Sequence, residues 1–309
     1  MPIVVLGNVF VDIKGFPDGV FIPAGRNSGR VETVHGGVGR NVAEDIANIE
    51  LRPRFVSMVD ATGEGSAVRE KLNRHKVDTS FLITVPDGMG IWLAVFDHTG
   101  DVVASISKRP NMQGMVDLLK TRGDEIFADA DSVVLEFDMD KEITSLVFKY
   151  AEKYSVPVYA LVANMSIAAR RRDMISKTDC FICNSQEAGI LFVEDYSGFT
   201  PEALCEEIYR RVVAAGMKSM VVTLGAEGAV YASANGDRGV CPAQPVEVRD
   251  TTGAGDAFCA GVSIGLTYGK SLKESVEIGT KLAASAIAVS ENTCPRFLPT
   301  EFGIDAIVD

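Results

Sequence analysis

The chain has 309 residues, of which 47% are hydrophobic, and a formal net charge of −12. This length and apolar content suit a folded protein with a large buried core. The acidic balance argues against nucleic acids and anionic membranes as partners, and no apolar run reaches the roughly 20 residues that cross a bilayer. The N-terminal sequence shows neither a basic region nor a signal cleavage site, so we expect a cytoplasmic protein.

Short apolar runs alternate with segments of helical spacing along most of the chain. The expected strands are 3–6, 55–58, 132–135, 156–161, 180–183 and 219–223, and the expected helices are 41–49, 65–74, 141–153, 185–192 and 201–215. A hairpin at 229–232 and 239–241 follows, and then two helices at about 254–267 and 272–289. This alternation is typical of an α/β fold with a mostly parallel sheet covered by helices.

Two segments, at about 12–33 and 88–107, interrupt the alternation. In the second, Ile91, Leu93 and Val95 alternate with Trp92, Ala94 and Phe96. A turn is expected at 97–100, and a strand resumes at 102–106. This pattern predicts a β-hairpin with a four-residue loop. We expect both segments to form a small β-sheet that serves as a lid, as a dimer surface, or as both.

Six cysteines are scattered through the chain, so a disulfide framework is not expected. Cys180 and Cys183 form a C-x-x-C pair inside a predicted strand. A zinc or redox role for this pair stays open beside simple packing of two small thiols.

The most informative run is 250–258, which precedes an apolar helix pattern. Glycines allow backbone N–H groups to approach a ligand closely, and the N-terminus of a helix favours phosphate. Asp256 would lie in the first turn beside these amides, where it could accept a proton from a hydroxyl during phosphoryl transfer. An ordinary helix N-cap with an acidic first turn is the alternative.

A second glycine-rich run, at 35–43, follows a predicted strand and opens a helix. Such a run lets a ligand lie against the backbone. Two partial dinucleotide fingerprints, starting at Gly37 and Gly63, each lack the third glycine, so a Rossmann site is disfavoured. A Walker A loop is also disfavoured, because only three residues separate Gly265 from Gly269.

Runs 36–43 and 250–258 resemble the N-terminal and C-terminal signatures of the PfkB/ribokinase family of carbohydrate and nucleoside kinases. Two shorter motifs follow the same family order, Asn-x-x-Glu at 184–187 and Thr-x-Gly-x-x-Gly at 223–228. The resemblance spans nearly the whole chain. It implies one kinase domain over 1–309 with a three-layer α/β/α ribokinase-like fold, a mostly parallel central sheet and a small β-sheet lid.

The resemblance also implies roles for individual residues in an ATP-dependent kinase. The catalytic residues would be Asp256, as the base, with Gly253, Ala254 and Gly255, whose amides would hold the transferred phosphoryl group. The acceptor would be bound by Asn8, Asp12, Gly36, Gly37 and Asn41. ATP would be bound by Asn184, Thr223, Gly225, Gly228 and Asn292. Glu187 would organise Mg²⁺ through water, although with Asn184 it could equally cap the next helix. In relatives activated by K⁺, the cation lies at the positions of Asp250 and Thr252.

The run 38–41 is most similar to the pseudouridine kinases of this family, so pseudouridine is the first expected acceptor. Lys108 and Arg109 depart from the expected acidic and amide-rich segment after the hairpin, so ribose, fructose, adenosine and 2-keto-3-deoxygluconate stay open. The run 36–41 argues against the vitamin and hydroxymethylpyrimidine kinases. A sugar-sensing protein without activity is the non-enzymatic alternative. The same small β-sheet leads us to expect a homodimer formed through the lid.

Overall fold

The computed structural model describes residues 2–98 and 101–305. The strands are β1 (Ile3–Leu6), β2 (Phe10–Pro17), β3 (Gly29–Gly36), β4 (Arg54–Val59), β5 (Leu82–Thr84), β6 (Gly90–Phe96), β7 (Val102–Lys108), β8 (Ser132–Glu136), β9 (Val158–Leu161), β10 (Cys180–Asn184), β11 (Ser219–Thr223), β12 (Ala229–Ser233) and β13 (Arg238–Cys241). The helices are α1 (Val38–Asn48), α2 (Gly63–Arg74), α3 (Gln113–Phe127), α4 (Lys141–Tyr154), α5 (Met165–Ala168), α6 (Arg172–Ile175), α7 (Ser185–Phe192), α8 (Pro201–Ala214), α9 (Ala254–Thr267) and α10 (Leu272–Ile287).

Nine strands form the central sheet, in the order β13-β12-β11-β10-β9-β8-β1-β4-β5. The pairs β11–β12 and β12–β13 are antiparallel, and the other neighbours are parallel. The carboxyl ends of the parallel strands therefore meet at one edge, which is where ligands bind in open α/β sheets.

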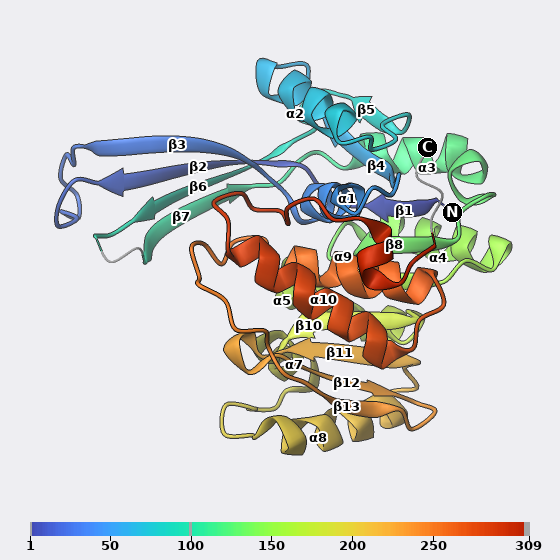
Figure 1. Cartoon of the computed structure of the whole chain (residues 1–309). Coiled ribbons are helices and arrows are strands. Elements are labelled where there is room, and N and C mark those ends of the chain that lie inside the picture. The colour runs from blue at the N-terminus through green and yellow to red at the C-terminus, as the bar shows by residue number, and fades with distance from the viewer. Residues whose placement is uncertain (1, 99–100, 306–309) are drawn as a thin grey trace.

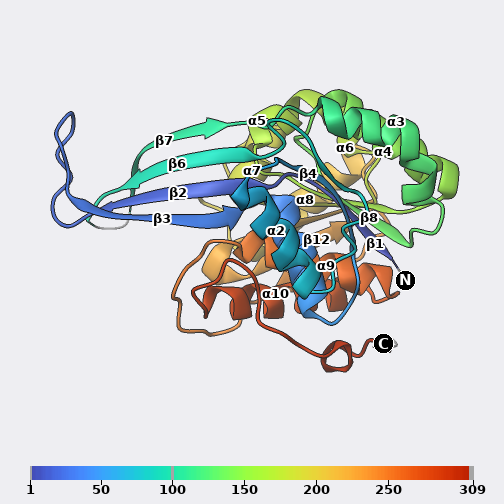
Figure 2. The ribbon, with the colours of Figure 1, turned by 90° about the horizontal axis from the view of Figure 1, so that it is seen from above.

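Helices cover both faces of this sheet, because successive side chains of a strand point to opposite faces. In β1, Ile3 and Val5 pack with α1, α2, α9 and α10, whereas Val4 and Leu6 pack with α3, α4 and α8. Figures 1 and 2 show these helix layers on either side of the sheet. The predicted mostly parallel sheet with helical cover is confirmed as a three-layer arrangement.

A second sheet of four strands, in the order β3-β2-β6-β7, projects from the body of the molecule (Figure 1). We call it the lid sheet. Its central pair β2–β6 is parallel and its outer pairs are antiparallel, and Asp12 lies beside Trp92 in the register. Residues 99 and 100 of the predicted turn lie outside the described residues.

Most predicted elements occur within two residues of their expected bounds, but α3 was not expected. The glycine and charged residues within it obscure its apolar face, which buries Met115, Leu119 and Ile126. No helix among the described residues is long and apolar enough to cross a membrane.

The structure decides between the two interpretations of the C-x-x-C pair in β10. Cys180 packs in the layer with α9 and α10, whereas Cys183 faces the opposite layer with α7. Both thiols are buried and free, and burial raises the pKa of Cys180 to about 12. Two side chains on opposite faces of a sheet cannot share a metal ion or form a disulfide, so the pair serves packing.

Candidate active site

The N-terminus of α9 opens at the edge where the parallel strands end. Gly253 caps the helix with φ 82°, a conformation that favours glycine, and a Cβ there would overlap the carbonyl oxygen of Asn292. Ala254 N donates to Thr251 O over 3.3 Å. The amides of Gly255 and Asp256 have no acceptor within residues 2–98 and 101–305. Free first-turn amides are the donors that a phosphate group needs.

Asp256 follows in the first turn of α9 and is partly buried. Its Oδ2 accepts a hydrogen bond of 2.6 Å from Asn41 Nδ2. Burial raises the pKa of Asp256 to about 6, the negative charge of Asp12 adds to the rise, and the Asn41 bond and the Arg40 charge oppose it. The carboxylate therefore lies beside the free amides with a pKa suited to accepting a proton near neutral pH.

The turn between β3 and α1 brings Asn41 to this carboxylate. Gly37 adopts φ 99°, and a Cβ there would overlap the carbonyl oxygen of Asn8. Gly39 packs directly on Gly7, the residue after β1, with no room for a side chain at either position. These close approaches place the first turn of α1 over the end of β1 and against α9.

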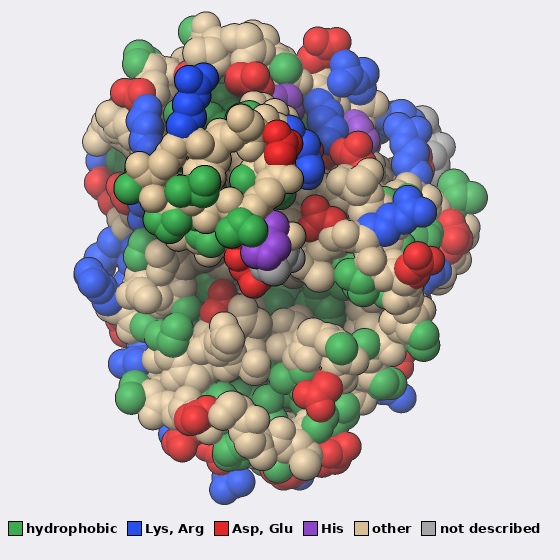
Figure 3. Space-filling model, turned by 90° about the vertical axis from the view of Figure 1, so that its left-hand side faces the viewer, with side chains coloured by type: hydrophobic (Ala, Val, Ile, Leu, Met, Phe, Trp, Pro, Cys, Tyr) green, Lys and Arg blue, Asp and Glu red, His purple; other side chains and the backbone are tan. Residues whose placement is uncertain are grey.

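A cavity of about 560 Å³ opens on the other side of the α9 N-terminus. Thr223, Gly225 and Gly228 line it from the β11–β12 connection, and Ala254 and Gly255 line it from α9. The remaining wall is largely apolar and includes Phe258, Ala283, Ala284 and Ile287. Figure 3 shows the hollowed surface below the lid sheet, with hydrophobic side chains gathered in it. An apolar slot that ends at unpaired amides suits a nucleobase with a phosphate chain.

Residues 2–299 match the sequence pattern of the pfkB family carbohydrate kinases. The chain belongs to this family. It is 32% identical to the guanosine-inosine kinase of Exiguobacterium acetylicum, over 94% of this chain and 95% of that protein. It is 22% identical to the pseudouridine kinase of Escherichia coli (strain K12), over 95% of this chain and 92% of that protein. As a member of this family, the chain is a sugar or nucleoside kinase, a phosphotransferase with an alcohol acceptor.

The predicted ribokinase-like fold is confirmed by a solved structure. Ribokinase of Arabidopsis thaliana, complexed with ribose and ATP, matches with a TM-score of 0.81 and 21% identity over 97% of this chain and 98% of that chain. The preference for pseudouridine gains no specific support, because the guanosine-inosine kinase is more similar than the pseudouridine kinase.

Within this pfkB fold, Asp12 lies on the lid sheet close to Asp256. A Cβ at Gly36 would overlap the Asp12 carboxylate, so this glycine leaves the carboxylate its space. Burial raises the pKa of Asp12, against the opposing charges of Lys14 and Arg40. Trp92, its neighbour in the β2–β6 register, lies on the same face of the lid sheet because paired residues share a face.

Asn8 turns its side chain toward a residue that the sequence analysis did not identify, Glu136. Glu136 Oε1 accepts from Asn8 Nδ2 at 2.6 Å, and Oε2 accepts from the amides of Asn8 at 2.8 Å and Gly39 at 3.2 Å. Burial, with the charge of Asp138, raises the pKa of Glu136 to about 7. The available signal was an acid at the end of a predicted apolar strand, which becomes informative only when β8 is known to neighbour β1.

Asn184 and Glu187 form the capping box that the sequence analysis left open beside metal binding. Asn184 Oδ1 accepts from Glu187 N, and Glu187 Oε2 accepts from Asn184 N, both at 2.8 Å. Asn184 pairs with Thr223, which lines the cavity, in the β10–β11 register, but neither Asn184 nor Glu187 lines the cavity itself. Burial raises the pKa of Glu187, and the charge of Asp138 raises it further. In the part of the chain that the structure describes, no group of three or more His, Cys, Asp or Glu side chains could hold a metal ion.

The remaining predicted residues lie around this centre. Asp250 Oδ1 accepts from Thr252 N at 2.9 Å in a local turn just before α9. Asn292 does not line the cavity; its side chain turns instead to His35 and Arg40. Lys108 and Arg109 are engaged by carboxylates, with Asp87 at 2.7 Å and Asp138 at 3.2 Å respectively. Each of these two cations therefore already has a carboxylate partner.

Proposed function

We propose that this kinase transfers the γ-phosphoryl group of ATP to the primary 5′-hydroxyl of a ribonucleoside, with inosine and guanosine as the first candidates. The observation that carries the reaction is the contact of Asn41 Nδ2 with Asp256 Oδ2 beside free amides of the α9 N-terminus. The similarity to a guanosine-inosine kinase supports the choice of acceptor.

In the proposed reaction, Asp256 accepts the proton of the acceptor hydroxyl. The hydroxyl oxygen bonds to the γ-phosphorus as the bond from that phosphorus to the β-bridging oxygen breaks, giving ADP and a nucleoside 5′-phosphate. Asn41 occupies Oδ2 of Asp256, which leaves Oδ1 for the hydroxyl. The amides of Gly255 and Asp256 would stabilise the charge that develops on the phosphoryl group.

The cavity beside α9 would receive ATP, with the base against Ala283, Ala284 and Ile287. Mg²⁺ prefers one or two carboxylates together with waters and phosphate oxygens. Glu187 fits that role through water. Its pKa is raised first by burial and further by the charge of Asp138, and a nearby cation would offset both effects. Asp250 and Thr252 are the residues that would hold K⁺, as the family resemblance implies.

Trp92 favours a nucleoside over a free pentose as the acceptor. It lies beside Asp12, the residue predicted to bind the sugar hydroxyls, on the same face of the lid sheet. An indole face next to the sugar position provides a stacking surface for a nucleobase, a contact worth about 1–3 kcal/mol per base. Free ribose would leave that surface unused.

A phosphorylation screen tests the proposal. Purified protein with MgATP is offered inosine, guanosine, adenosine, pseudouridine, ribose, fructose and 2-keto-3-deoxygluconate, with and without K⁺, and ADP release and the phosphorylated product are both measured. The proposal expects the highest kcat/KM with inosine or guanosine. Higher kcat/KM with ribose or pseudouridine would move the assignment to those acceptors, and binding without turnover would favour the sugar-sensing alternative.

We also propose a homodimer formed through the lid sheet. Leu93 pairs with Ile106 and with Ile13 in the register, so these side chains share the face opposite Asp12. Ile106 is 70% exposed and Leu93 is 41% exposed. An exposed apolar sheet face of this kind favours association. Analytical ultracentrifugation should give a dimer for wild type and a monomer for Ile106→Lys.

The ATP-consuming reaction is consistent with the predicted cytoplasmic location.

A further inference from the structure

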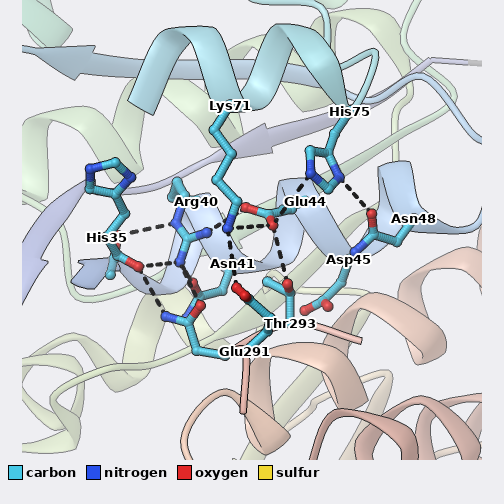
Figure 4. Close-up of polar contacts among 12 residues, drawn as sticks. His35, Arg40, Asn41, Glu44, Asp45, Asn48, Lys71, His75, Glu291 and Thr293 are labelled. Atoms are coloured by element: carbon cyan, nitrogen blue, oxygen red, sulfur yellow. Dashed lines mark hydrogen bonds and ion pairs between the residues drawn. The ribbon is translucent and has the colours of Figure 1, made fainter. Parts of the chain in front are cut away.

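Arg40 is the largest of the fully buried side chains in the described part of the chain, and it lies beside the proposed active site (Figure 4). A buried guanidinium is strongly unfavourable unless its charge is paired and its donors are bonded. Its partners therefore indicate what this position does. They fall into two groups, one on the charge-pairing side and one on the side of the active site.

On the charge-pairing side, Glu44 neutralises the guanidinium. Arg40 Nη1 donates to Glu44 Oε2 at 2.5 Å, and Glu44 Oε1 accepts from Lys71 Nζ at 2.9 Å and from Thr293 Oγ1 at 3.2 Å. Burial raises the pKa of Glu44, but the charges of Arg40 and Lys71 outweigh it and hold the pKa below its usual value. Figure 4 shows these groups between α1 and α2. The pair is thus ionised and held in place.

On the side of the active site, Nη2 of Arg40 lies within hydrogen-bond reach of oxygens from three separate segments, which share its two N–H donors. These oxygens are the carbonyl of His35 at 2.6 Å, Oδ1 of Asn41, and Oδ1 of Asn292 at 3.2 Å. His35 belongs to the lid strand β3, Asn41 to α1, and Asn292 to the loop after α10. One nitrogen of Arg40 therefore contacts the lid strand β3, the helix α1 that carries Asn41, and the loop that packs against Gly253.

The contact with Asn41 determines which way its amide points. A guanidinium only donates hydrogen bonds, so the oxygen of the Asn41 amide must face Arg40. The nitrogen must then face Asp256, where it donates to Oδ2 at 2.6 Å. We infer that Arg40 is a positioning residue, which orients the Asn41 amide and thereby holds the Asp256 carboxylate with Oδ1 free for the acceptor. This inference rests on the proposed function, because it needs Asp256 to act as the base.

The charge of Arg40 has a second effect on Asp256. Among the described residues, the charged and titratable groups that interact with this carboxylate are Arg40 and Asp45 from α1, Asp12 from β2, and Cys259 from α9 itself. Burial raises the pKa of Asp45 well above its usual range, and Arg40 is the cation that favours ionised Asp256. Loss of Arg40 should therefore raise the pKa of Asp256 and move the acid limb of the activity profile to higher pH.

The experiment measures kcat/KM with MgATP against pH for three proteins, using inosine or the best acceptor of the screen. The double variant Arg40→Met, Glu44→Gln removes both buried charges together, which folded proteins often tolerate. We expect its acid limb to move up by about one pH unit and its plateau kcat to fall about tenfold. The matched control Glu44→Gln keeps Arg40 on Asn41, so its limb should not move upward although its thermal stability should fall. An unmoved limb and an unchanged kcat in the double variant would overturn the inference.

A double-mutant cycle gives a second test in case the double variant folds poorly. Arg40→Lys keeps the charge beside Glu44 but lacks the planar fork that also reaches Asn41. We expect about a tenfold fall in kcat in the wild-type background and less than about twofold in the Asn41→Ala background. Equal falls in both backgrounds would mean that Arg40 does not act through Asn41. An active wild type with these negative results overturns the inference alone, whereas a wild type inactive with every acceptor overturns the proposed function as well.

Discussion

Asn41 Nδ2 lies 2.6 Å from Asp256 Oδ2, and the two residues are 215 positions apart in the chain. This bond joins the two glycine-rich signatures of the molecule at one carboxylate. It also leaves the other carboxylate oxygen available to a hydroxyl group. The proposed chemistry depends on this arrangement.

Asp256→Asn should bind both substrates nearly as the wild type does and lose most of its turnover. The amide keeps the volume and one acceptor for Asn41, but it cannot take a proton. We expect kcat to fall by about 10²–10⁴-fold. Steady-state kinetics measures the fall and calorimetric titration measures acceptor affinity; a kcat near that of the wild type would contradict the role of Asp256.

The same variant should change how stability depends on pH. The folded-state pKa of Asp256 is about 6, above its ordinary value near 3.9 in an unfolded chain. The wild type therefore loses stability as pH rises from about 4 through 6, because ionising the partly buried carboxyl opposes folding. Asp256→Asn should have a higher Tm than wild type at pH 8 and little advantage at pH 4. Thermal unfolding at both pH values measures this, and an equal difference at both would exclude the raised pKa.

Gly37→Ala should destabilise the protein and reduce kcat together. The residue needs φ 99°, and a Cβ there would overlap the Asn8 carbonyl oxygen, so α1 must move and carry Asn41 with it. We expect a loss of about 1–3 kcal/mol in the free energy of unfolding. Gly63→Ala is the control, because a Cβ at Gly63 meets nothing within 4 Å. Urea unfolding compares the two, and a Gly37 variant as stable as its control would contradict the close approach.

Trp92 is the only tryptophan in the chain, so its fluorescence reports directly on the proposed base contact. Inosine should change the emission, whereas free ribose should change it little. Trp92→Ala should raise KM for inosine about tenfold or more, in line with the loss of one stacked base, and leave any activity with ribose nearly unaltered. Equal changes in KM for inosine and for ribose would mean that the nucleobase does not stack on Trp92.

Ala284→Phe should fill part of the cavity beside α9 without contacting the residues that are proposed to bind the acceptor. Ala284 lines that cavity, so the larger ring should raise KM for ATP about tenfold while KM for the acceptor stays within about twofold. Bisubstrate kinetics separates the two constants. A larger rise for the acceptor than for ATP would reverse the proposed assignment of the two pockets.

The patterns that were readable in the sequence are local. The strand alternation, the capping box at Asn184 and the glycine turns depend on neighbouring residues, so their elements occur close to the predicted bounds. The helix α3 escaped prediction because its apolar face becomes clear only against the sheet that it covers.

The sequence by itself determined the family signatures, the position of Asp256 beside a helix N-terminus and the alternation of strands and helices. Only the tertiary structure decided that Glu136 holds Asn8, that Arg40 joins His35 to Asn292, and that Cys180 and Cys183 face opposite layers. The physical reason is distance along the chain. The contacts from Asn8 to Glu136 and from Arg40 to Asn292 span 128 and 252 positions, and strand order, not local spacing, brings such side chains together.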